Sequence, residues 1–281
     1  MEYCYLNGQI SPLSEAKVSI NDIGLLRGYG IYDGLAVFGG KPFRFADHFK
    51  RFLDGAHALN LNIPITEEKA EKMIIEIAEK SGLSSPGSRA NVRMILTGGD
   101  TIRGIEYDFD KPTFYIIIEK FEPLPKELYE NGGKLITYRY KRELPEHKTI
   151  NYITAVNLQN YKKDQGAVEI LYTYDGEVLE CSTSNIFLVK DNKLITPLDG
   201  VLEGITKKVV LEIAKQEGIE IEERVVYEEE LATTDEIFIT SSFKDILPIV
   251  KIDDFVVGGG NVGEITKKLM LKFEQYIANF S

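Results

Sequence analysis

Cysteine, histidine and long apolar runs are scarce in this sequence, and each shortage excludes a class of protein. Two cysteines and three histidines stand among 281 residues, too few for a disulfide framework or a structural zinc cluster. The histidines, His48, His57 and His147, show no metal-ligand spacing. No apolar run approaches the roughly 20 residues of a transmembrane helix, and the first residues, "MEYCYLNGQI", lack the basic and apolar parts of an export signal. We therefore expect a cytoplasmic protein without a metal site.

Basic residues are also in deficit. Lys and Arg number 33 against 44 Asp and Glu, which gives a net charge of −11. Such a charge argues against nucleic-acid binding. The dense acidic run at Tyr227–Leu231 is interpreted as a solvated helix start. An anionic ligand would need a local basic pocket, so isolated arginines at apolar positions become candidates for function.

Composition and patterning predict two domains of mixed structure. With 43% hydrophobic and 27% charged residues, the chain is typical of globular proteins and long enough for two cores. Strand-like and helical runs alternate in both halves, which indicates α/β or α+β domains. The stretch "EPLPKELYENGG" holds two prolines and a Gly-Gly pair. We expect a small domain over residues 1–121, a linker over 122–133 and a large domain over 134–281.

Turn and capping residues mark individual elements. Asn7-Gly8 and Gly39-Gly40 predict hairpin turns. A helix over residues 46–61 is expected with Asp47 as its N-cap, and another begins with a capping box at Thr66 and ends at Gly82. Further helices are expected over 150–166, 205–219 and 262–280, and a strand over 236–242.

The segment "HKTINY", His147–Tyr152, contains a lysine that could be catalytic. A lone lysine is usually solvated, so its role depends on what the rest of the chain supplies. A pyridoxal-phosphate enzyme needs an imine-forming amine, an acid facing the pyridine nitrogen and a phosphate cradle. Lys148 could supply the amine. Glu180, which ends an alternating strand in "GEVLECSTSN", could supply the acid, although an ordinary strand-end glutamate would look the same.

Two segments could hold a phosphate. In "LEGITKKVV", Gly204, Ile205 and Thr206 begin an amphipathic helix, whose free N–H groups and dipole favour an anion. A plain N-cap would have the same pattern. In "EIFITSS", a strand runs into a turn at Thr240–Ser242. Arg51 in "HFKRF" could supply the opposite charge, unless it is a solvated helix arginine.

Taken in order, "HKTINYITAV", "GEVLECSTSNIFLV", "TPLDGVLEGITKKVV" and "DEIFITSSFKDILPIVKID" resemble the motifs of the fold-type IV, or class IV, pyridoxal-phosphate enzymes. This family includes D-amino-acid aminotransferases, branched-chain aminotransferases and 4-amino-4-deoxychorismate lyases. "RGYGIYDGLAVFGGKPFRFADHFKRF" resembles its small-domain motif, so the resemblance covers most of the chain. It implies a small N-terminal and a larger C-terminal α/β domain with pyridoxal 5'-phosphate between them, and a homodimer.

The resemblance also implies roles for individual residues. Lys148 corresponds to the Schiff-base lysine that moves the substrate proton, and Glu180 to the carboxylate facing the pyridine nitrogen. Tyr32 corresponds to the aromatic residue of the substrate pocket, which would also include Phe243. Tyr152 would lie near the ring oxygen if the chain follows the branched-chain pattern. The other cofactor-binding residues implied are Arg51, Asn185, Leu202, Gly204, Ile205, Thr206, Ser241 and Ser242.

A substrate carboxylate needs a cation or hydroxyl, and Arg27, Arg93 and Lys244 are the candidates. Arg27 precedes the glycines that lead to Tyr32, so it could reach the mouth of a pocket. Arg93 alternates with apolar residues in a strand, which fits either a pocket wall or, with slight preference, a structural ion pair.

The motifs leave the substrate open. The spacing from Lys148 to Asn151 is shared with D-amino-acid aminotransferases and the lyases, whereas the Asn-Tyr pair favours the branched-chain enzymes. "EGITKK" keeps an aminotransferase-like phosphate motif. A non-enzymatic binding module is disfavoured because Lys148, Glu180 and Arg51 are all retained. We predict an aminotransferase that acts on amino acids and 2-oxo acids, with D-amino acids slightly preferred and the branched-chain L-amino-acid and lyase alternatives open.

Overall fold

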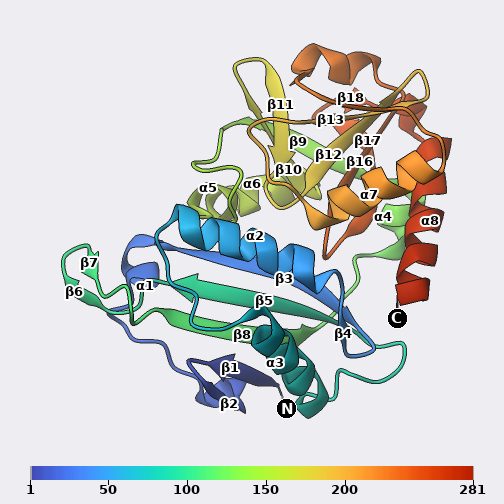
Figure 1. Cartoon of the computed structure of the whole chain (residues 1–281). Helices are drawn as coiled ribbons and strands as arrows, with labels where there is room; N and C mark the ends of the chain where they lie inside the picture. Colours follow the sequence, from blue (N-terminus) through green and yellow to red (C-terminus); the bar gives the residue numbers. More distant parts are fainter. Residues whose placement is uncertain (1, 281) are drawn as a thin grey trace. The chain divides into compact units, whose positions relative to one another are not determined.

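Two units can be distinguished by their internal packing in this computed structural model, which describes residues 2–280 (Figure 1). The first contains the chain up to Glu122, the segment His147–Tyr152 and Phe280, and the second contains Pro123–Glu146 and Ile153–Asn279. The expected linker over 122–133 includes helix α4 (Lys126–Asn131), which packs against the core of the second unit. By internal packing, His147–Tyr152 groups with the first unit although it lies within residues 134–281.

An antiparallel sheet with the strand order β2-β1-β8-β5-β3-β4 forms the base of the first unit. Asn7-Gly8 and Gly39-Gly40 all have positive φ and close the two predicted hairpins. The strands are β1 (Tyr3–Leu6), β2 (Gln9–Pro12), β3 (Gly30–Phe38), β4 (Lys41–Pro42), β5 (Arg89–Thr97) and β8 (Thr113–Lys120). Outside this sheet lie the 3-10 turn η1 (Leu13–Glu15), helix α1 (Ile23–Arg27) and the hairpin of β6 (Thr101–Arg103) with β7 (Glu106–Tyr107).

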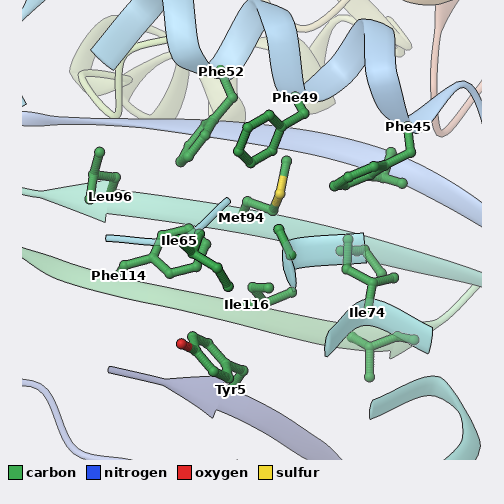
Figure 2. Close-up of a cluster of buried hydrophobic side chains, with 14 of the residues drawn as sticks. Tyr5, Phe45, Phe49, Phe52, Ile65, Ile74, Met94, Leu96, Phe114 and Ile116 are labelled. Atoms are coloured by element: carbon green, nitrogen blue, oxygen red, sulfur yellow. The ribbon is translucent and has the colours of Figure 1, made fainter. Parts of the chain in front are cut away.

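Helices α2 (Phe45–Ala58) and α3 (Glu67–Lys80) share one hydrophobic core with this sheet. Phe45, Phe49 and Phe52 recur at the helical period and point from α2 onto the sheet (Figure 2). Full burial of a phenylalanine side chain contributes about 1.5–3 kcal/mol. The rotation of α2 about its axis is therefore fixed, and with it the places of the polar residues between these phenylalanines.

The two helices begin in different ways. Thr66 caps α3 as predicted, because its hydroxyl accepts a 3.3 Å hydrogen bond from the Lys69 amide. The prediction for α2 is wrong: Arg44, with φ 50°, holds the N-cap position and Asp47 lies in the first turn. Asp47 instead accepts a 2.6 Å hydrogen bond from Arg44 Nε, and its charge favours the positive end of the helix dipole.

The second unit is built on a mixed sheet with the order β14-β13-β12-β16-β17-β9-β10-β11-β15, and β18 pairs with β17. Most neighbours are antiparallel, but β9 runs parallel to β10 and to β17, and β13 runs parallel to β14. The strands are β9 (Gly133–Arg139), β10 (Glu169–Tyr174), β11 (Glu177–Cys181), β12 (Asn185–Lys190), β13 (Lys193–Pro197), β14 (Ile221–Arg224), β15 (Val226–Tyr227), β16 (Glu236–Ser241), β17 (Asp245–Ile252) and β18 (Phe255–Val256). The helices are α4, α5 (Ile153–Asn157), α6 (Gln159–Asp164), α7 (Ile205–Gln216) and α8 (Glu264–Phe280), with 3-10 turns η2 (Glu228–Thr233) and η3 (Gly258–Gly260).

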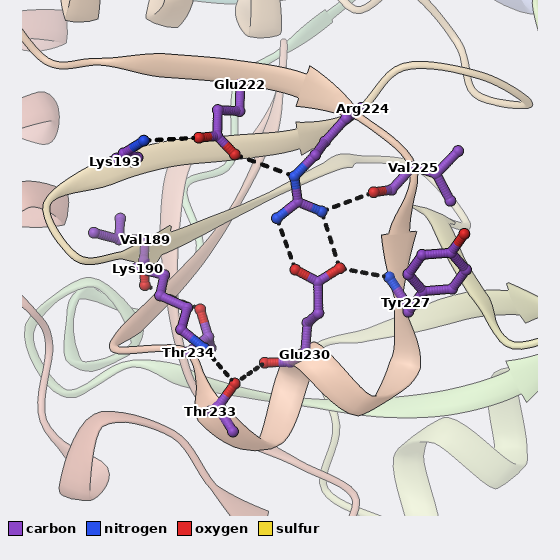
Figure 3. Close-up of polar contacts among 10 residues, drawn as sticks. All are labelled: Val189, Lys190, Lys193, Glu222, Arg224, Val225, Tyr227, Glu230, Thr233 and Thr234. Carbon is purple, nitrogen blue, oxygen red and sulfur yellow. Dashed lines mark hydrogen bonds and ion pairs between the residues drawn. The ribbon is translucent and has the colours of Figure 1, made fainter.

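The acidic run at Tyr227–Leu231 begins η2 and has a structural role. Glu230 accepts a hydrogen bond from the amide of Tyr227 at 2.9 Å and a bidentate pair from Arg224 at 2.9 and 2.7 Å (Figure 3). Its carboxylate thus satisfies an orphan amide at the start of the helix and neutralises a strand-end arginine. The run serves as a helix start, as interpreted from the sequence.

The helix predicted over 150–166 is wrong at its start and in its middle. α5 begins only at Ile153, and Leu158, with φ −87° and ψ 1°, separates it from α6. The start of the expected helix is displaced because the backbone of Ile150 is bound to β3 instead, through the hydrogen bond from Ile150 N to Gly30 O at 3.0 Å. No helix within residues 2–280 is long and apolar enough to cross a membrane.

Candidate active site

Lys148 lies in the first unit beside Tyr32. The amide of Tyr32 donates a 2.9 Å hydrogen bond to the carbonyl of Lys148, and Ile31 forms an antiparallel bridge with Thr149. Gly30 eases this approach, since a Cβ there would lie only 3.0 Å from the Ile150 side chain. The segment is therefore held by backbone hydrogen bonds, and the position of Lys148 does not depend on a flexible loop.

The side chains of this segment meet those of β3. Lys148 Nζ lies 4.5 Å from the ring centroid of Tyr32, a distance at which an ammonium is attracted to the ring face. The hydroxyl of Tyr32 donates to the hydroxyl of Tyr152 at 2.7 Å. The structure thus brings together the amine and the two tyrosines that the sequence motifs singled out.

Arg51 of α2 forms a bidentate ion pair with Asp33 of β3. The distances are 2.8 Å from Nε to Oδ2 and 2.9 Å from the second guanidinium nitrogen to Oδ1. Only 11% of the Arg51 side chain is exposed, so it is not a solvated helix arginine. These two hydrogen bonds fix the orientation of the planar guanidinium, and this would prepare it to bind a phosphate.

His48 completes a buried cluster with Asp33 and Arg51. Its Nδ1 lies 2.7 Å from Asp33 Oδ1. Burial lowers the pKa of His48, and the charges of Arg51 and Lys148 add to this against the opposing effect of Asp33. Burial raises the pKa of Asp33, but the stronger sum of Arg51 and His48 interactions brings it well below its usual range. At neutral pH the cluster is a carboxylate, a neutral imidazole and a guanidinium.

Glu180, at the end of β11, is held by two donors in the second unit. Its Oε1 accepts a 2.6 Å hydrogen bond from Arg142 Nε, and its Oε2 accepts one of 3.0 Å from the Leu202 amide. Both side chains are nearly buried, with 10% of Arg142 and 7% of Glu180 exposed. The guanidinium supplies the opposite charge that a nearly buried carboxylate requires. Glu180 can therefore act as an anion toward a heterocyclic N–H.

Arg142 was missed in the sequence, where nothing distinguishes it from its charged neighbours in "YKRELPEHK". It also donates to the carbonyl of Pro145, which orders the loop that leads to His147–Tyr152. The buried polar contact to Glu180 becomes visible only once β11 and this loop are folded.

Asn185 holds the loop that precedes α7. Its Nδ2 donates a 2.7 Å hydrogen bond to the carbonyl of Leu202, while the amide of the same leucine binds Glu180. Gly204 is needed next to it, because a Cβ there would lie 1.9 Å from Asn185 Oδ1. Leu202 is thus fixed at both its amide and its carbonyl.

The N-terminus of α7 has the chemistry of an anion site. Gly204 occupies the N-cap position, and no side chain of the described residues caps this helix. Within residues 2–280, the amides of Ile205 and Thr206 have no hydrogen-bond partner, and the intrahelical series starts with Lys208 N to Gly204 O at 2.9 Å. Two amides, the helix dipole and the Thr206 hydroxyl together suit a phosphate.

Ser241 is the last residue of β16 and Ser242 begins the turn that follows, with Phe243 half-buried next to them. Lys244 ends this turn, and its amide donates to Ser241 Oγ at 3.2 Å. Its side chain, a candidate for the substrate carboxylate, is instead engaged by Glu169, with Nζ 2.9 Å from Oε2. A buried carboxylate competes directly with any substrate for this ammonium.

The other two carboxylate candidates differ in their surroundings. Arg27, at the end of α1, is exposed and donates to the carbonyl of Leu26 at 2.8 Å. Arg93 on β5 forms a 2.9 Å ion pair with Glu119 on β8, with about two fifths of each side chain exposed. Of the two roles expected for Arg93, a pocket wall or a structural ion pair, this contact favours the ion pair.

Cys181 is a buried free thiol whose pKa is raised, chiefly by burial, so it is a poor nucleophile. Among the described residues, no group of three or more His, Cys, Asp and Glu side chains could hold a metal ion.

Comparison with known proteins gives consistent results. A family model described as amino-transferase class IV matches residues 30–252. A protein of Methanocaldococcus jannaschii, provisionally named a branched-chain-amino-acid aminotransferase, is 35% identical over 280 residues, covering 96% of this chain and 94% of that protein. The D-alanine aminotransferase of Staphylococcus aureus (strain COL) is 31% identical over 293 residues, covering 100% of both.

Solved structures show the same fold. The branched-chain aminotransferase of the thermophilic archaeon Thermoproteus uzoniensis, solved with norvaline, superimposes with a TM-score of 0.85 and 26% identity, covering 98% of this chain and 94% of that one. The predicted fold class, two-domain and α/β of the fold-type IV kind, is confirmed by this match. The resemblance stated from the sequence motifs is confirmed as well.

Proposed function

The chain belongs to the class IV aminotransferase family, and on this premise we propose that it moves an amino group from a D-amino acid to a 2-oxo acid with Lys148 as the catalytic amine. That it is an aminotransferase follows from the family. The substrates, the cofactor-binding residues and the assembly are the proposal. The observation that carries it is the position of Lys148 Nζ over the Tyr32 ring, on a segment fixed by hydrogen bonds to β3.

The residues present fit pyridoxal 5'-phosphate by the chemistry of their donors. The uncapped start of α7, with the amides of Ile205 and Thr206, suits a dianionic phosphate, and Arg51 and Ser242 would complete its binding. Glu180, paired with Arg142, suits a protonated pyridine nitrogen. When bound, this cofactor withdraws electrons from the substrate Cα and so acidifies its C–H bond.

The chain's own residues then have distinct tasks. The amine of Lys148 would accept the proton that leaves the substrate Cα and later donate a proton, so that it would act first as a general base and then as a general acid. Glu180 keeps a positive charge on the ring nitrogen, since its own charge is supported by Arg142. Leu202, fixed at its amide by Glu180 and at its carbonyl by Asn185, would support the ring.

The preference for D-amino acids rests on two observations. The Lys148–Asn151 spacing matches that of the D-amino-acid enzymes, and a D-alanine aminotransferase is 31% identical along its full length. Two observations favour branched-chain L-amino acids: the relative provisionally named a branched-chain aminotransferase is 35% identical over 96% of this chain, and the 2.7 Å hydrogen bond between the hydroxyls of Tyr32 and Tyr152 places the tyrosine of the Asn-Tyr pair beside the proposed substrate-pocket residue. This is the second candidate function.

Half-reactions test the choice. Purified holoenzyme is mixed separately with D-alanine, D-glutamate, L-leucine and L-glutamate, and the cofactor absorbance and the 2-oxo acid formed are followed. We expect rapid bleaching by the D-amino acids. Bleaching by L-leucine and L-glutamate alone would replace the D-amino-acid assignment with the branched-chain one, and release of pyruvate and 4-aminobenzoate from aminodeoxychorismate would indicate the lyase.

A homodimer in the cytoplasm is part of the same proposal. Segment 18–26 and the β6–β7 hairpin are joined by the hydrogen bond from Thr101 N to Asn21 O at 3.0 Å, and together they expose apolar side chains that a second copy would cover. These are Val18, Ile20, Leu25, Leu26, Ile102 and Ile105, and Phe109 is exposed just after the hairpin. The free buried cysteines, Cys4 and Cys181, suit a reducing compartment.

Sedimentation measures the assembly. We expect the wild type to sediment as a dimer and Ile105→Asp as a monomer, with Leu271→Asp, an exposed leucine of α8, as the control that leaves the dimer intact. A monomeric wild type at micromolar concentration would contradict the dimer, and a dimeric Ile105→Asp variant would place its interface elsewhere.

A further inference from the structure

Glu169, the first residue of β10, is a buried carboxylate to which no role has been assigned so far. It is 2% exposed. It accepts hydrogen bonds from the hydroxyls of Ser182, Thr183 (2.6 Å) and Ser184 (3.2 Å), and from Lys244 Nζ at 2.9 Å. A buried charge persists only when it is paired and hydrogen-bonded, so this set of donors is what allows Glu169 to be an anion.

The protonation state of Glu169 is consistent with this arrangement. Burial raises its pKa, but the charge of Lys244 and the hydroxyl and ammonium hydrogen bonds lower it further, to about 2. The carboxylate is thus ionised throughout the neutral range. Glu169 binds the hydroxyls of one turn and, through its ion pair, Lys244 of another, and Lys244 bonds directly to Thr183 across 61 residues of sequence.

The first of these turns is residues 182–184, which directly follows Glu180 and Cys181. The polar side chains of this turn point to Glu169. The turn is closed by the hydrogen bond from Cys181 N to Ser184 O at 2.8 Å. Asn185 directly follows the turn, and its Nδ2 donates a 2.7 Å hydrogen bond to the carbonyl of Leu202. Any shift of this turn would therefore displace the residues on either side of it, Glu180 and Asn185.

The second turn is residues 241–244, which contains the proposed phosphate contacts. Lys244 fixes it through its main chain, since its amide donates to Ser241 Oγ at 3.2 Å and its carbonyl accepts from the Tyr129 hydroxyl at 3.1 Å. Its Nζ also donates to Thr183 Oγ1 at 2.7 Å. One lysine therefore links the end of the second turn to the middle of the first.

A role for Lys244 in binding the substrate carboxylate is incompatible with these contacts. Turning Nζ toward a substrate would leave Glu169 buried without its opposite charge, which is strongly unfavourable. Only 17% of the Lys244 side chain is exposed, and the shape of the turn holds it where Glu169 can reach it.

We propose that Glu169 and Lys244 are positioning residues of the cofactor site, whose ion pair joins turn 182–184 to turn 241–244 and so keeps Glu180 and Ser241–Ser242 in place. The inference rests on the proposed function, since the roles of Glu180 and Ser242 come from there. It adds two residues that act through others and touch neither cofactor nor substrate.

The test compares Lys244→Met, Glu169→Gln and Lys244→Arg with the wild type. Lys251→Met is the matched control, because Lys251 lies on the neighbouring strand β17 and its ion-pair partner, Asp254, is exposed and 3.8 Å away. The first readout is hydrogen exchange of the apoprotein. Lys244→Met should increase exchange at both turns, including turn 182–184 in which no residue was changed, and Lys244→Arg should restore much of the protection.

The second readout is the affinity for pyridoxal 5'-phosphate, measured by absorbance titration. Loss of one charge-assisted contact should weaken it by about tenfold in both Lys244→Met and Glu169→Gln, while the KM for the amino donor stays near that of the wild type. Lys251→Met should change neither quantity.

A raised KM in Lys244→Met, with unchanged exchange at turn 182–184 and unchanged cofactor affinity, would overturn the proposal and make Lys244 a substrate contact. Failure of the proposed function looks different, because a wild type that binds no cofactor would still show whether exchange at the two turns is coupled in the apoprotein. If the wild type binds the cofactor normally but Lys244→Met leaves hydrogen exchange at turn 182–184 unchanged, the positioning role is contradicted and the proposed function is not.

Discussion

Arg142 Nε lies 2.6 Å from Glu180 Oε1, and the amide of Leu202 binds the other oxygen of the same carboxylate at 3.0 Å. This carboxylate is thus held from two directions by donors that come from separate loops. Its orientation is set before any ligand binds, which is the condition under which a charged group stabilises a reaction most effectively.

Glu180 should matter more for turnover than for cofactor retention. Glu180→Gln keeps the shape but removes the charge that supports a protonated ring nitrogen, so kcat should fall by on the order of 10²-fold or more. Cofactor occupancy, measured by absorbance after gel filtration, should decrease much less. Glu177→Gln, on the same strand β11, is the control. Near-normal turnover with reduced occupancy would contradict this role.

Lys148 should be the residue that bonds covalently to the cofactor. Its amine lies over Tyr32 on a segment fixed to β3, whereas Lys141 lies in the loop beside Arg142. Borohydride reduction and peptide mapping should place the label on Lys148 alone. The variant Lys148→Ala should lose turnover and the label together, and a label on Lys141 or Lys134 would refute the assignment.

Arg51 should contribute to cofactor retention through the phosphate. Arg51→Ala removes a charge-assisted contact, so the affinity for the cofactor should fall by roughly 1.5–3 kcal/mol. It also leaves Asp33 with His48 alone, so the melting temperature of the apoprotein has to be compared in parallel. Lys50→Ala, an exposed neighbour on α2, is the control. Equal retention in dialysis against phosphate buffer would assign Arg51 a purely structural role.

Acid should destabilise the protein within a defined range. The folded-state pKa of Glu169, about 2, lies below its ordinary value of 4.5, so its contribution is complete above about pH 4.5 and is lost as the pH falls toward 2. A shift of this size corresponds to on the order of 3 kcal/mol. Denaturant unfolding from pH 6 to pH 3 should show the decline, and it should be shallower in Glu169→Gln. The pKa of Asp33 is also lowered, so part of the decline in stability should persist in Glu169→Gln. If stability falls equally steeply with pH in the wild type and in Glu169→Gln, Glu169 does not contribute to the acid sensitivity.

Arg27 is the candidate cation left for the substrate carboxylate. Arg27→Ala should raise the KM of the amino donor while the cofactor absorbance is unchanged, the pattern of a lost binding contact. Arg93→Ala provides the comparison, because Arg93 is already paired with Glu119 at 2.9 Å and should affect stability more than KM. The opposite result, with KM raised only in Arg93→Ala, would exchange the two roles.

The sequence predicted those features that depend on neighbours in the chain. The turns at Asn7-Gly8 and Gly39-Gly40 and the cap at Thr66 rest on residues that set backbone geometry locally. The motif order also identified the family, because Lys148 and Glu180 each stand in a short, specific segment.

Other features depend on pairings between distant residues, and local patterns carry no record of them. The hydrogen bonds between residues 30–32 and 148–150 replace the start of the expected helix. Lys244 pairs with Glu169 across a sequence separation of 75 residues, and Arg142 reaches Glu180 from an unremarkable charged loop. Each is a buried polar contact, and burial is a property of the folded chain alone.

The packing of His147–Tyr152 with the first unit has a consequence for biosynthesis. As the chain leaves the ribosome, residues up to Glu122 emerge first, but their packing partners at 147–152 follow only after the first strand of the second unit, β9, has been made. The contact between the rings of Phe43 and Phe280 becomes available later still, once α8 has been made. The N-terminal segment alone is therefore an incomplete folding unit, and a gene fragment ending at Glu122 would encode neither the edge pairing of β3 nor the lysine it positions.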